Sequence, residues 1–170
     1  MKEIVFTNFL PILLVIVFSG SHLESATVSE RGREPETFNV GSEDPEMNQA
    51  IKRARDSVQS FLKQLVAPKQ NQSHFSVKKP FPFGKDGENE HIWVNSLRYD
   101  GTRLHGKISN TPVDLKNLRL GDLVSFLPSE ISDWMILEDG EIVGGFTFRV
   151  LWHRMTPEEQ MQFGKVRFKN

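Results

Sequence analysis

The chain contains no cysteine among its 170 residues. This absence excludes disulfide bonds, thiolate metal ligands, a cysteine nucleophile and a lipid anchor attached through cysteine. An excess of charge is also missing, since 21 lysine and arginine residues are balanced by 22 aspartate and glutamate residues. A nearly neutral chain has no general attraction to nucleic acid or to anionic lipid. We therefore expect no nucleic-acid partner.

Motifs of the common catalytic classes are absent as well. The sequence contains no G-x-S-x-G nucleophile elbow. Its Gly144-Gly145 pair lies inside an expected strand instead of before a helix, so it does not form a phosphate-binding loop. The five histidines show none of the spacings typical of a zinc site. The sequence thus identifies no catalytic residue, and we predict no metal and no cofactor.

The longest apolar run lies near the N-terminus. Lys2 precedes the almost entirely apolar residues 4–18, and the small residues 19–21 follow. This order is typical of a secretory signal peptide. We predict that residues 1–21 are a cleaved export signal and that the protein is periplasmic or secreted. An uncleaved membrane anchor is the main alternative and a buried core helix the other, although about 20 apolar residues are needed to span a bilayer.

The rest of the chain divides by composition. Residues 22–43 mix charges of both signs with Ser, Thr, Gly and Pro and show no apolar period, which is typical of a flexible spacer. We predict one domain over residues 44–163 and a frayed tail over residues 164–170.

A long amphipathic helix is expected at the start of this domain. Asp44 is a suitable N-cap, and Pro45 suits the first helical position. Apolar residues then recur with helical spacing over residues 47–65, and Pro68 ends the pattern. At the other end of the domain, Thr156 begins a capping box that predicts a short final helix.

Two Asp-Gly pairs predict hairpins, because a two-residue type I′ turn needs positive φ at both positions. A tight turn at Asp139-Gly140 places Ile136 opposite Val143 and Trp134 opposite Gly145. The arm after the turn alternates over residues 146–152, as a half-buried strand does.

The second predicted hairpin turns at Asp100-Gly101. A two-residue turn places Trp93 opposite Ile108 and Leu97 opposite Leu104. A longer turn would shift this register.

Several short motifs occur in a fixed order between residues 90 and 155. They are EHIWV at 90–94, LGD at 120–122, ISDWM at 131–135, DG at 139–140, GG at 144–145 and RVLWHRM at 149–155. Their order and spacing resemble the bacterial domain of unknown function 2314 family, the YegJ-like proteins. The resemblance implies one compact α+β domain and carries no catalytic residue. We therefore predict an α+β fold in which a long N-terminal helix packs on a twisted, mainly antiparallel sheet of about five or six strands, either open or curled toward a barrel.

Asp133 is the first candidate site residue. It lies within an apolar run, and a buried acid needs a partner. It is either a structural acid bonded to backbone amides or part of a functional site, and Arg149 or Arg98 is a suitable partner. An alternative with hydrolytic activity would pair Asp133 with a histidine such as His105.

Aromatic residues offer another route to function. Trp134 and Trp152 would form a binding patch if they were exposed, whereas core packing is their alternative role. An export signal, a spacer and a domain without catalytic motifs together favour a non-catalytic binding module for a protein or a cell-wall component. An envelope hydrolase using Asp133 with a histidine as acid and base is the alternative function, and the ligand is not evident from the sequence.

Overall fold

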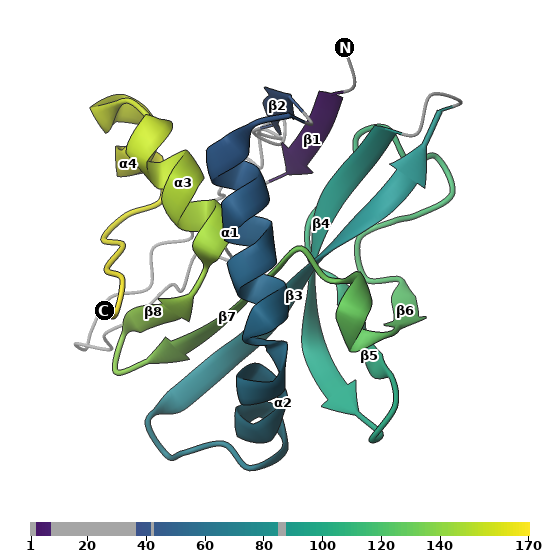
Figure 1. Cartoon of the computed structure of the whole chain (residues 1–170), viewed down its shortest axis with the longest axis vertical. Coiled ribbons are helices and arrows are strands. Elements are labelled where there is room, and N and C mark those ends of the chain that lie inside the picture. Colours follow the sequence, from purple (N-terminus) through teal and green to yellow (C-terminus); the bar gives the residue numbers. More distant parts are fainter. Residues whose placement is uncertain (1–2, 8–36, 42, 85–87) are drawn as a thin grey trace, which may run out of the picture.

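The structure is a computed structural model that describes residues 3–7, 37–41, 43–84 and 88–170 (Figure 1). In chain order, its elements are β1 (Glu3–Thr7), β2 (Thr37–Gly41), α1 (Pro45–Asp56), α2 (Val58–Val66), β3 (Gln72–Phe83), β4 (Glu88–Tyr99), β5 (Leu104–Ile108), β6 (Leu123–Phe126), a 3-10 turn (Pro128–Glu130), β7 (Asp133–Glu138), β8 (Glu141–Gly144), α3 (Phe146–Arg154) and α4 (Pro157–Gln162). The α+β class expected from the sequence is confirmed.

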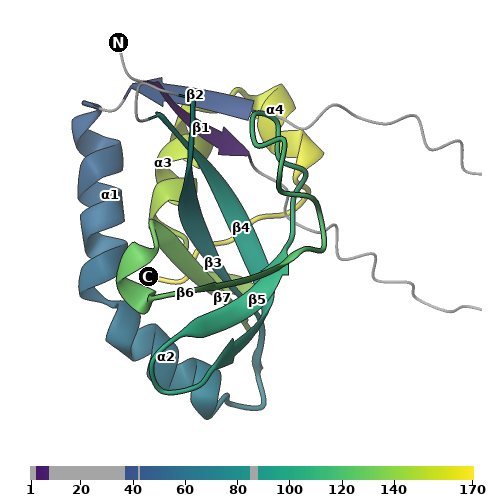
Figure 2. The same ribbon diagram turned by 90° about the vertical axis from the view of Figure 1, so that its right-hand side faces the viewer.

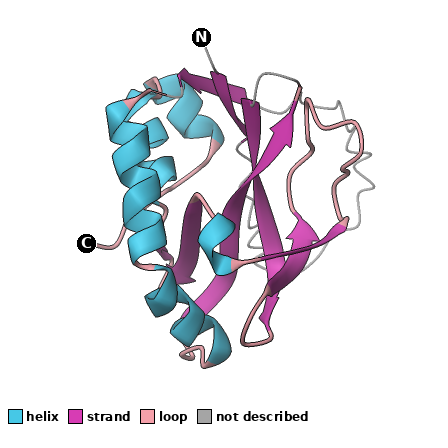
Figure 3. Cartoon of the chain, turned by 45° about the vertical axis from the view of Figure 1, so that its right-hand side comes forward, coloured by secondary structure: helices cyan, strands magenta, loops and turns pink. Residues whose placement is uncertain are grey.

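Six of these strands, β3 to β8, form an open antiparallel sheet. Their order is β6-β5-β4-β3-β7-β8, and β1 adds to β4 in parallel beside β5, with β2 outside it. In the described part of the chain, β6 pairs only with β5 and β8 pairs with no named strand except β7. The sheet therefore does not close, and the barrel alternative is wrong. Figure 2 shows α1 and α2 running along one side of the strands, and Figure 3 shows the same layering by secondary structure.

The expected long N-terminal helix is divided in two at Ser57. The predicted start is confirmed, because a carboxylate oxygen of Asp44 accepts from the amide of Met47 at 2.9 Å. At the break, the Ser57 hydroxyl donates to the carbonyl of Arg53 at 2.7 Å, and the indole N–H of Trp134 reaches both the Ala54 carbonyl and that hydroxyl. A side chain inserted beside the helical ladder bends or breaks a helix. The prediction of a single helix was thus wrong, because the break depends on Trp134, which is distant in sequence.

The segment after β8 is a helix, α3, and not the strand that its alternation predicted. Its buried residues are Thr147, Phe148 and Leu151, and Met155 is buried just beyond its end. The apolar residues 148, 151 and 155 have helical spacing, so the same sequence satisfied both periods. The strand prediction for residues 146–152 is wrong, and the cause is an N-terminal cap supplied by Asp133, described below.

The Asp139-Gly140 hairpin is confirmed in its register. Ile136 lies opposite Val143, and both turn residues have positive φ, 54° and 76°. The last pair is Met135 with Gly144, after which the amide of Gly145 donates to the carbonyl of Trp134 at 2.8 Å.

The second hairpin has a longer turn than predicted. Tyr99 pairs with Leu104, so four residues connect the strands, and a register shift follows between Asn95 and Arg98, near Ser96 with φ of 50°. As a result Val94, and not Trp93, lies opposite Ile108. The predicted pairs of Trp93 with Ile108 and of Leu97 with Leu104 are wrong.

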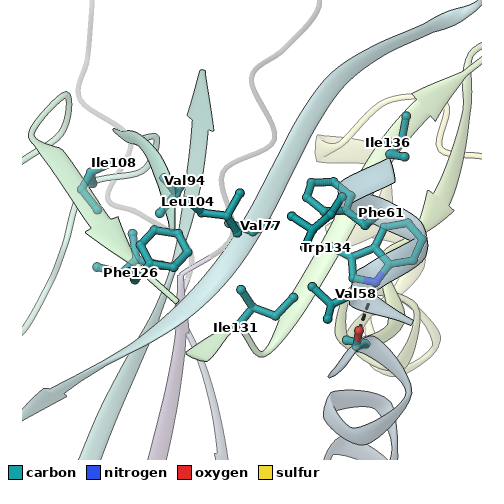
Figure 4. Close-up of a cluster of buried hydrophobic side chains, with 13 residues drawn as sticks. Val58, Phe61, Val77, Val94, Leu104, Ile108, Phe126, Ile131, Trp134 and Ile136 are labelled. Carbon is teal, nitrogen blue, oxygen red and sulfur yellow. Dashed lines mark hydrogen bonds between the residues drawn. The ribbon is translucent and has the colours of Figure 1, made fainter. Parts of the chain in front are cut away.

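Two apolar clusters fill the core. The larger one joins residues of α1, α2 and the strands, and Figure 4 shows Phe61, Val77 and Trp134 within it. The other joins Trp93 and Met135 to α1 and α3. Alternate residues of β7 enter different clusters, as expected for side chains that point to opposite faces of a strand.

The C-terminal residues lie along β8. Phe168 forms a bridge with Ile142, whose amide donates to Arg167 at 2.8 Å and whose carbonyl accepts from Lys169 at 2.9 Å. Arg149 holds the same segment by donating to the carbonyl of Lys169 at 2.7 Å. The tail expected to fray therefore makes strand-like bonds in this structure.

The N-terminal predictions fall mostly outside the described residues. Strand β1 lies within the segment predicted as an export signal, and β2 lies within the predicted spacer. The remaining parts, residues 1–2, 8–36 and 42, are not among those that the structure describes. Within the described ranges, none of the helices has the length and apolar character required to cross a bilayer.

Replacing Gly144 with alanine tests the close packing at the end of the hairpin. A Cβ atom there would lie 2.7 Å from the ring of Trp134, on a backbone with φ of 78°. We expect the free energy of unfolding to fall by about 3 kcal/mol, from positive φ and overlap together. Urea denaturation measures this loss.

The control is Gly164→Ala, where φ is 69° but no atom lies within 4 Å of the added Cβ. It should cost only about 1 kcal/mol, the cost of the backbone conformation. Equal losses of stability in the two variants would mean that the short distance to Trp134 does not restrict the side chain at position 144.

Candidate functional site

The polar interior of the domain lies where β3, β4 and β7 meet α3. Lys78, Ser132, Asp133 and Thr147 are fully buried there, and His91 is nearly so. The register places Lys78 of β3 opposite Asp133 of β7. So many buried polar groups close together require mutual hydrogen bonds.

Asp133 caps α3 from a neighbouring strand. One carboxylate oxygen accepts from the amides of Trp134 and Phe146 at 2.8 and 2.9 Å. The other accepts from the amide and the hydroxyl of Thr147 at 2.8 and 2.6 Å, and from the amide of Phe148 at 3.3 Å. A carboxylate at a helix N-terminus satisfies free amides and favours the positive end of the helix dipole. These bonds explain why the chain becomes helical immediately after Gly145.

The charge state of Asp133 reflects opposing effects. Burial raises the pKa of its carboxyl, whereas the charge of Lys78 and the hydrogen bonds from Thr147 and Trp134 lower it. Neither arginine expected as a partner is bonded to this carboxylate. Arg149 instead donates to the carbonyls of Gly144 and Lys169.

Lys78 is a buried cation that sequence reasoning missed. Its ammonium donates to the Thr147 hydroxyl at 3.1 Å and lies 4.7 Å from the centroid of the Trp93 ring. Burial lowers the pKa of Lys78 to about 8, and the charge of Asp133 opposes that shift. No local signal separates Lys78 from the adjacent Lys79, so only the register with Asp133 would have identified it.

His91 and Ser132 form a second buried pair that was missed. Nδ1 of His91 lies 2.8 Å from the Ser132 hydroxyl, which is also 3.3 Å from the carbonyl of Lys78. Burial, followed by the charges of Lys78, Arg55 and Lys79, lowers the pKa of His91 to about 3. A serine beside a neutral histidine is the pair that acyl transfer requires. Here both side chains are buried, so a substrate does not reach the hydroxyl in this structure.

The structure separates the five sequence candidates. Trp134 is buried with its indole against the break between α1 and α2, and Arg149 binds the C-terminal tail. Trp152 is partly buried among Phe148, Phe163 and Phe168. These side chains therefore have packing and bonding roles in the fold.

His105 lies apart from Asp133. It is on β5, which β4 and β3 separate from β7, and its Nε2 is 2.7 Å from a carboxylate oxygen of Asp100. Asp133 and His105, the pair named for the hydrolase alternative, are thus not brought together. In the described ranges, no three histidine, aspartate or glutamate side chains are grouped so that they could hold a metal.

Apolar side chains are exposed at the β6 edge of the sheet. Leu123 is 79% exposed, Leu120 in the preceding loop 59%, and Leu127 just after the strand 40%. We call these three leucines the β6 surface. Grouped exposed apolar side chains mark interaction sites more often than scattered ones do.

Comparison with known proteins places this chain among bacterial relatives. The model of the DUF2314 family, described as an uncharacterized protein conserved in bacteria, matches residues 44–167. Over 132 residues the chain is 32% identical to the Putative ankyrin repeat protein NMB1133/NMB1171 of Neisseria meningitidis serogroup B, covering 74% of this chain and 52% of that protein. Over 113 residues it is 33% identical to the Uncharacterized protein YegJ of Escherichia coli K12, covering 66% of this chain and 71% of that protein.

The aligned region thus spans about half the length of the Neisseria protein. No solved structure is significantly similar to the chain.

Replacing Asp133 with asparagine tests the cap of α3. The amide keeps one acceptor oxygen but turns an NH2 group toward donors, so we expect the free energy of unfolding to fall by about 3 kcal/mol. Asp56→Asn is the matched control, because Asp56 is exposed and pairs with Lys52 on the surface. It should change stability by less than about 1 kcal/mol. Urea denaturation followed by circular dichroism measures both, and equal effects would contradict a structural role for Asp133.

Acid should destabilise the protein through His91. Its folded pKa of about 3 lies below the ordinary value of 6.5, so the unfolded chain binds more protons between these pH values. Stability therefore falls as the pH falls through this window, by about 3 kcal/mol at pH ~4. Urea denaturation at several pH values should show a steeper loss in the wild type than in His91→Gln, which has no titrating group. If the free energy of unfolding fell equally with pH in both proteins, His91 would be excluded as the cause.

Proposed function

Since the chain belongs to the DUF2314 family of bacterial proteins, we propose that it is an exported, non-catalytic binding domain for a protein or another component of the cell envelope. The contrast between its interior and its surface supports this proposal. The polar groups best suited to chemistry are buried and bonded to one another, whereas the leucines of the β6 surface are exposed.

The hydrolase alternative would need Asp133 to meet a substrate. The oxygens of Asp133 already accept from five N–H or O–H donors. His105, the histidine considered with it, pairs with Asp100 instead. These contacts favour a structural role for Asp133 and count against a catalytic pair of Asp133 with His105.

Export is supported by the sequence of the N-terminal segment. A basic residue, an apolar run and small residues follow one another over residues 1–21. A periplasmic or secreted binding domain is therefore the form of the proposal that we favour, and an uncleaved anchor would hold the same domain at the membrane.

Affinity capture from the native host tests this function. The full chain carrying a C-terminal tag is produced in its own bacterium, purified from the envelope or the medium, and examined by mass spectrometry. We expect the recovered protein to begin shortly after residue 21 and to retain an envelope component in stoichiometric amount. Leu123→Asn should reduce the retained component about tenfold, the loss of roughly 1.4 kcal/mol of apolar contact.

Met161→Asn is the control, since Met161 is equally exposed but lies on α4, away from β6. A chain that is recovered with no retained component would contradict the binding function. Recovery of the intact N-terminus in the cytoplasm would contradict export.

A further inference from the structure

The two outer edges of the antiparallel sheet differ in how their backbone is covered. At β8, residues 167–169 of the chain itself supply hydrogen bonds to Ile142. At β6, pairing with β5 is the only strand pairing within the described part of the chain. An uncovered edge with apolar side chains is a template for another strand.

The backbone groups that point outward from β6 follow from its register. The amide of Ile108 donates to Asp122, and the pairing continues with Gly106 opposite Val124. Hydrogen-bonded pairs alternate along an antiparallel ladder, so the N–H and C=O groups of Leu123 and Ser125 point away from β5. The Ser125 carbonyl is bonded to the guanidinium of Arg103 at 2.9 Å. Both groups of Leu123 and the amide of Ser125 are left facing outward.

Side chains on the outer face of β6 give this edge its specificity. Leu123 and Leu127 lie on that face, while Val124 and Phe126 are turned toward the core. Side chains four residues apart in an added strand would face the two leucines, and the side chain midway between them would face Ser125, because the side-chain period of a strand is two. The occupant is thus required to have two apolar residues four positions apart.

Three cations lie along this edge. Exposed Lys107 lies opposite Leu123, the guanidinium of Arg103 spans Ser125, and exposed Arg119 precedes the strand. Among the nearby acids, a carboxylate oxygen of Asp122 accepts from the amide of Arg119 at 2.8 Å. Glu130 is bonded to the Leu127 amide and paired with Lys79 at 3.1 Å. Asp100 accepts from the Arg103 amide and lies 2.7 Å from Nε2 of His105, the residue opposite Ser125.

We propose that the β6 edge binds an extended segment of a partner protein in which two apolar residues four positions apart flank an acidic residue midway between them, and that this segment joins the sheet as an added strand. This inference rests on the binding function proposed above and specifies its partner. Main-chain hydrogen bonds to Leu123 and Ser125 supply affinity, and the leucines with Lys107 and Arg103 select the side chains.

A second copy of this chain fits the edge less well. Antiparallel pairing of β6 with β6 would bring the same cations, Lys107, Arg103 and Arg119, from both copies to one interface. Like charges placed across an interface oppose association. An acidic segment meets the same cations with opposite charge, so charge favours a different protein as the occupant.

Selection from a phage-displayed library of short random peptides on the immobilised full chain tests the inference. The selected peptides should carry two apolar residues four positions apart with Asp or Glu midway between them. Ser125→Pro removes an outward amide without removing a bond to β5, and Lys107→Glu reverses one charge. Each should weaken binding of a selected peptide at least about tenfold in calorimetry. The controls Met161→Asn and Lys63→Glu, at exposed positions on α4 and α2, should bind as the wild type does.

A second measurement does not depend on the folding of any variant. Amide hydrogen exchange at Leu123 and Ser125 of the wild type should slow when a selected peptide is added. The inference is overturned by peptides without acidic residues, by unchanged exchange at both amides, or by a dimer that dissociates in Ser125→Pro. Failure to select any peptide also overturns it. In that case the capture experiment with the native host still decides the broader binding function.

Discussion

The bond between Asp133 and the first turn of α3 organises much of the domain. Through it β7, which lies between β3 and β8, holds the helix that closes over one apolar cluster. The same carboxylate is linked through the Thr147 hydroxyl to the ammonium of Lys78 on β3. One acid therefore satisfies a helix end and offsets a buried cation, two costs that would otherwise oppose folding.

This arrangement explains why the polar side chains of the interior are not accessible to a substrate in this structure. His91 is kept neutral by burial and by nearby cations, and Ser132 is bonded within the fold. Groups that would be nucleophile or base on a surface are here parts of the support for α3 and the sheet. The parts of the domain that meet other molecules are consequently its edges and loops, of which β6 carries the most exposed leucine.

Local rules predicted the features that depend on adjacent residues. The turn at Asp139-Gly140 and the cap at Asp44 follow from positive φ and from free amides, and both are present. The capping box at Thr156 likewise starts α4. Asp133 was also identified as a buried acid in need of a partner, because it interrupts an apolar run.

Features that depend on distant contacts were not predictable from one sequence. The break at Ser57 needs the indole of Trp134, and α3 needs the carboxylate of Asp133, since residues 146–152 satisfy the periods of strand and helix alike. The second hairpin took another register because Asp100 accepts from the amides of Thr102 and Arg103 and so stabilises a longer turn. The residues adjacent to Lys78 and His91 in the sequence do not indicate that these two side chains are buried.

The separation in sequence between Asp133 and α3 has a consequence for the order of folding. The hairpin of β7 and β8 and the helix after it are contacts between near neighbours, whereas β3 must find β7 across some sixty residues, as in the pair of Val77 with Trp134. Short loops close with less entropy loss than long ones, so the hairpin with its capped helix is the natural early unit. In that order, Lys78 enters an environment in which its counter-charge, Asp133, is already in place.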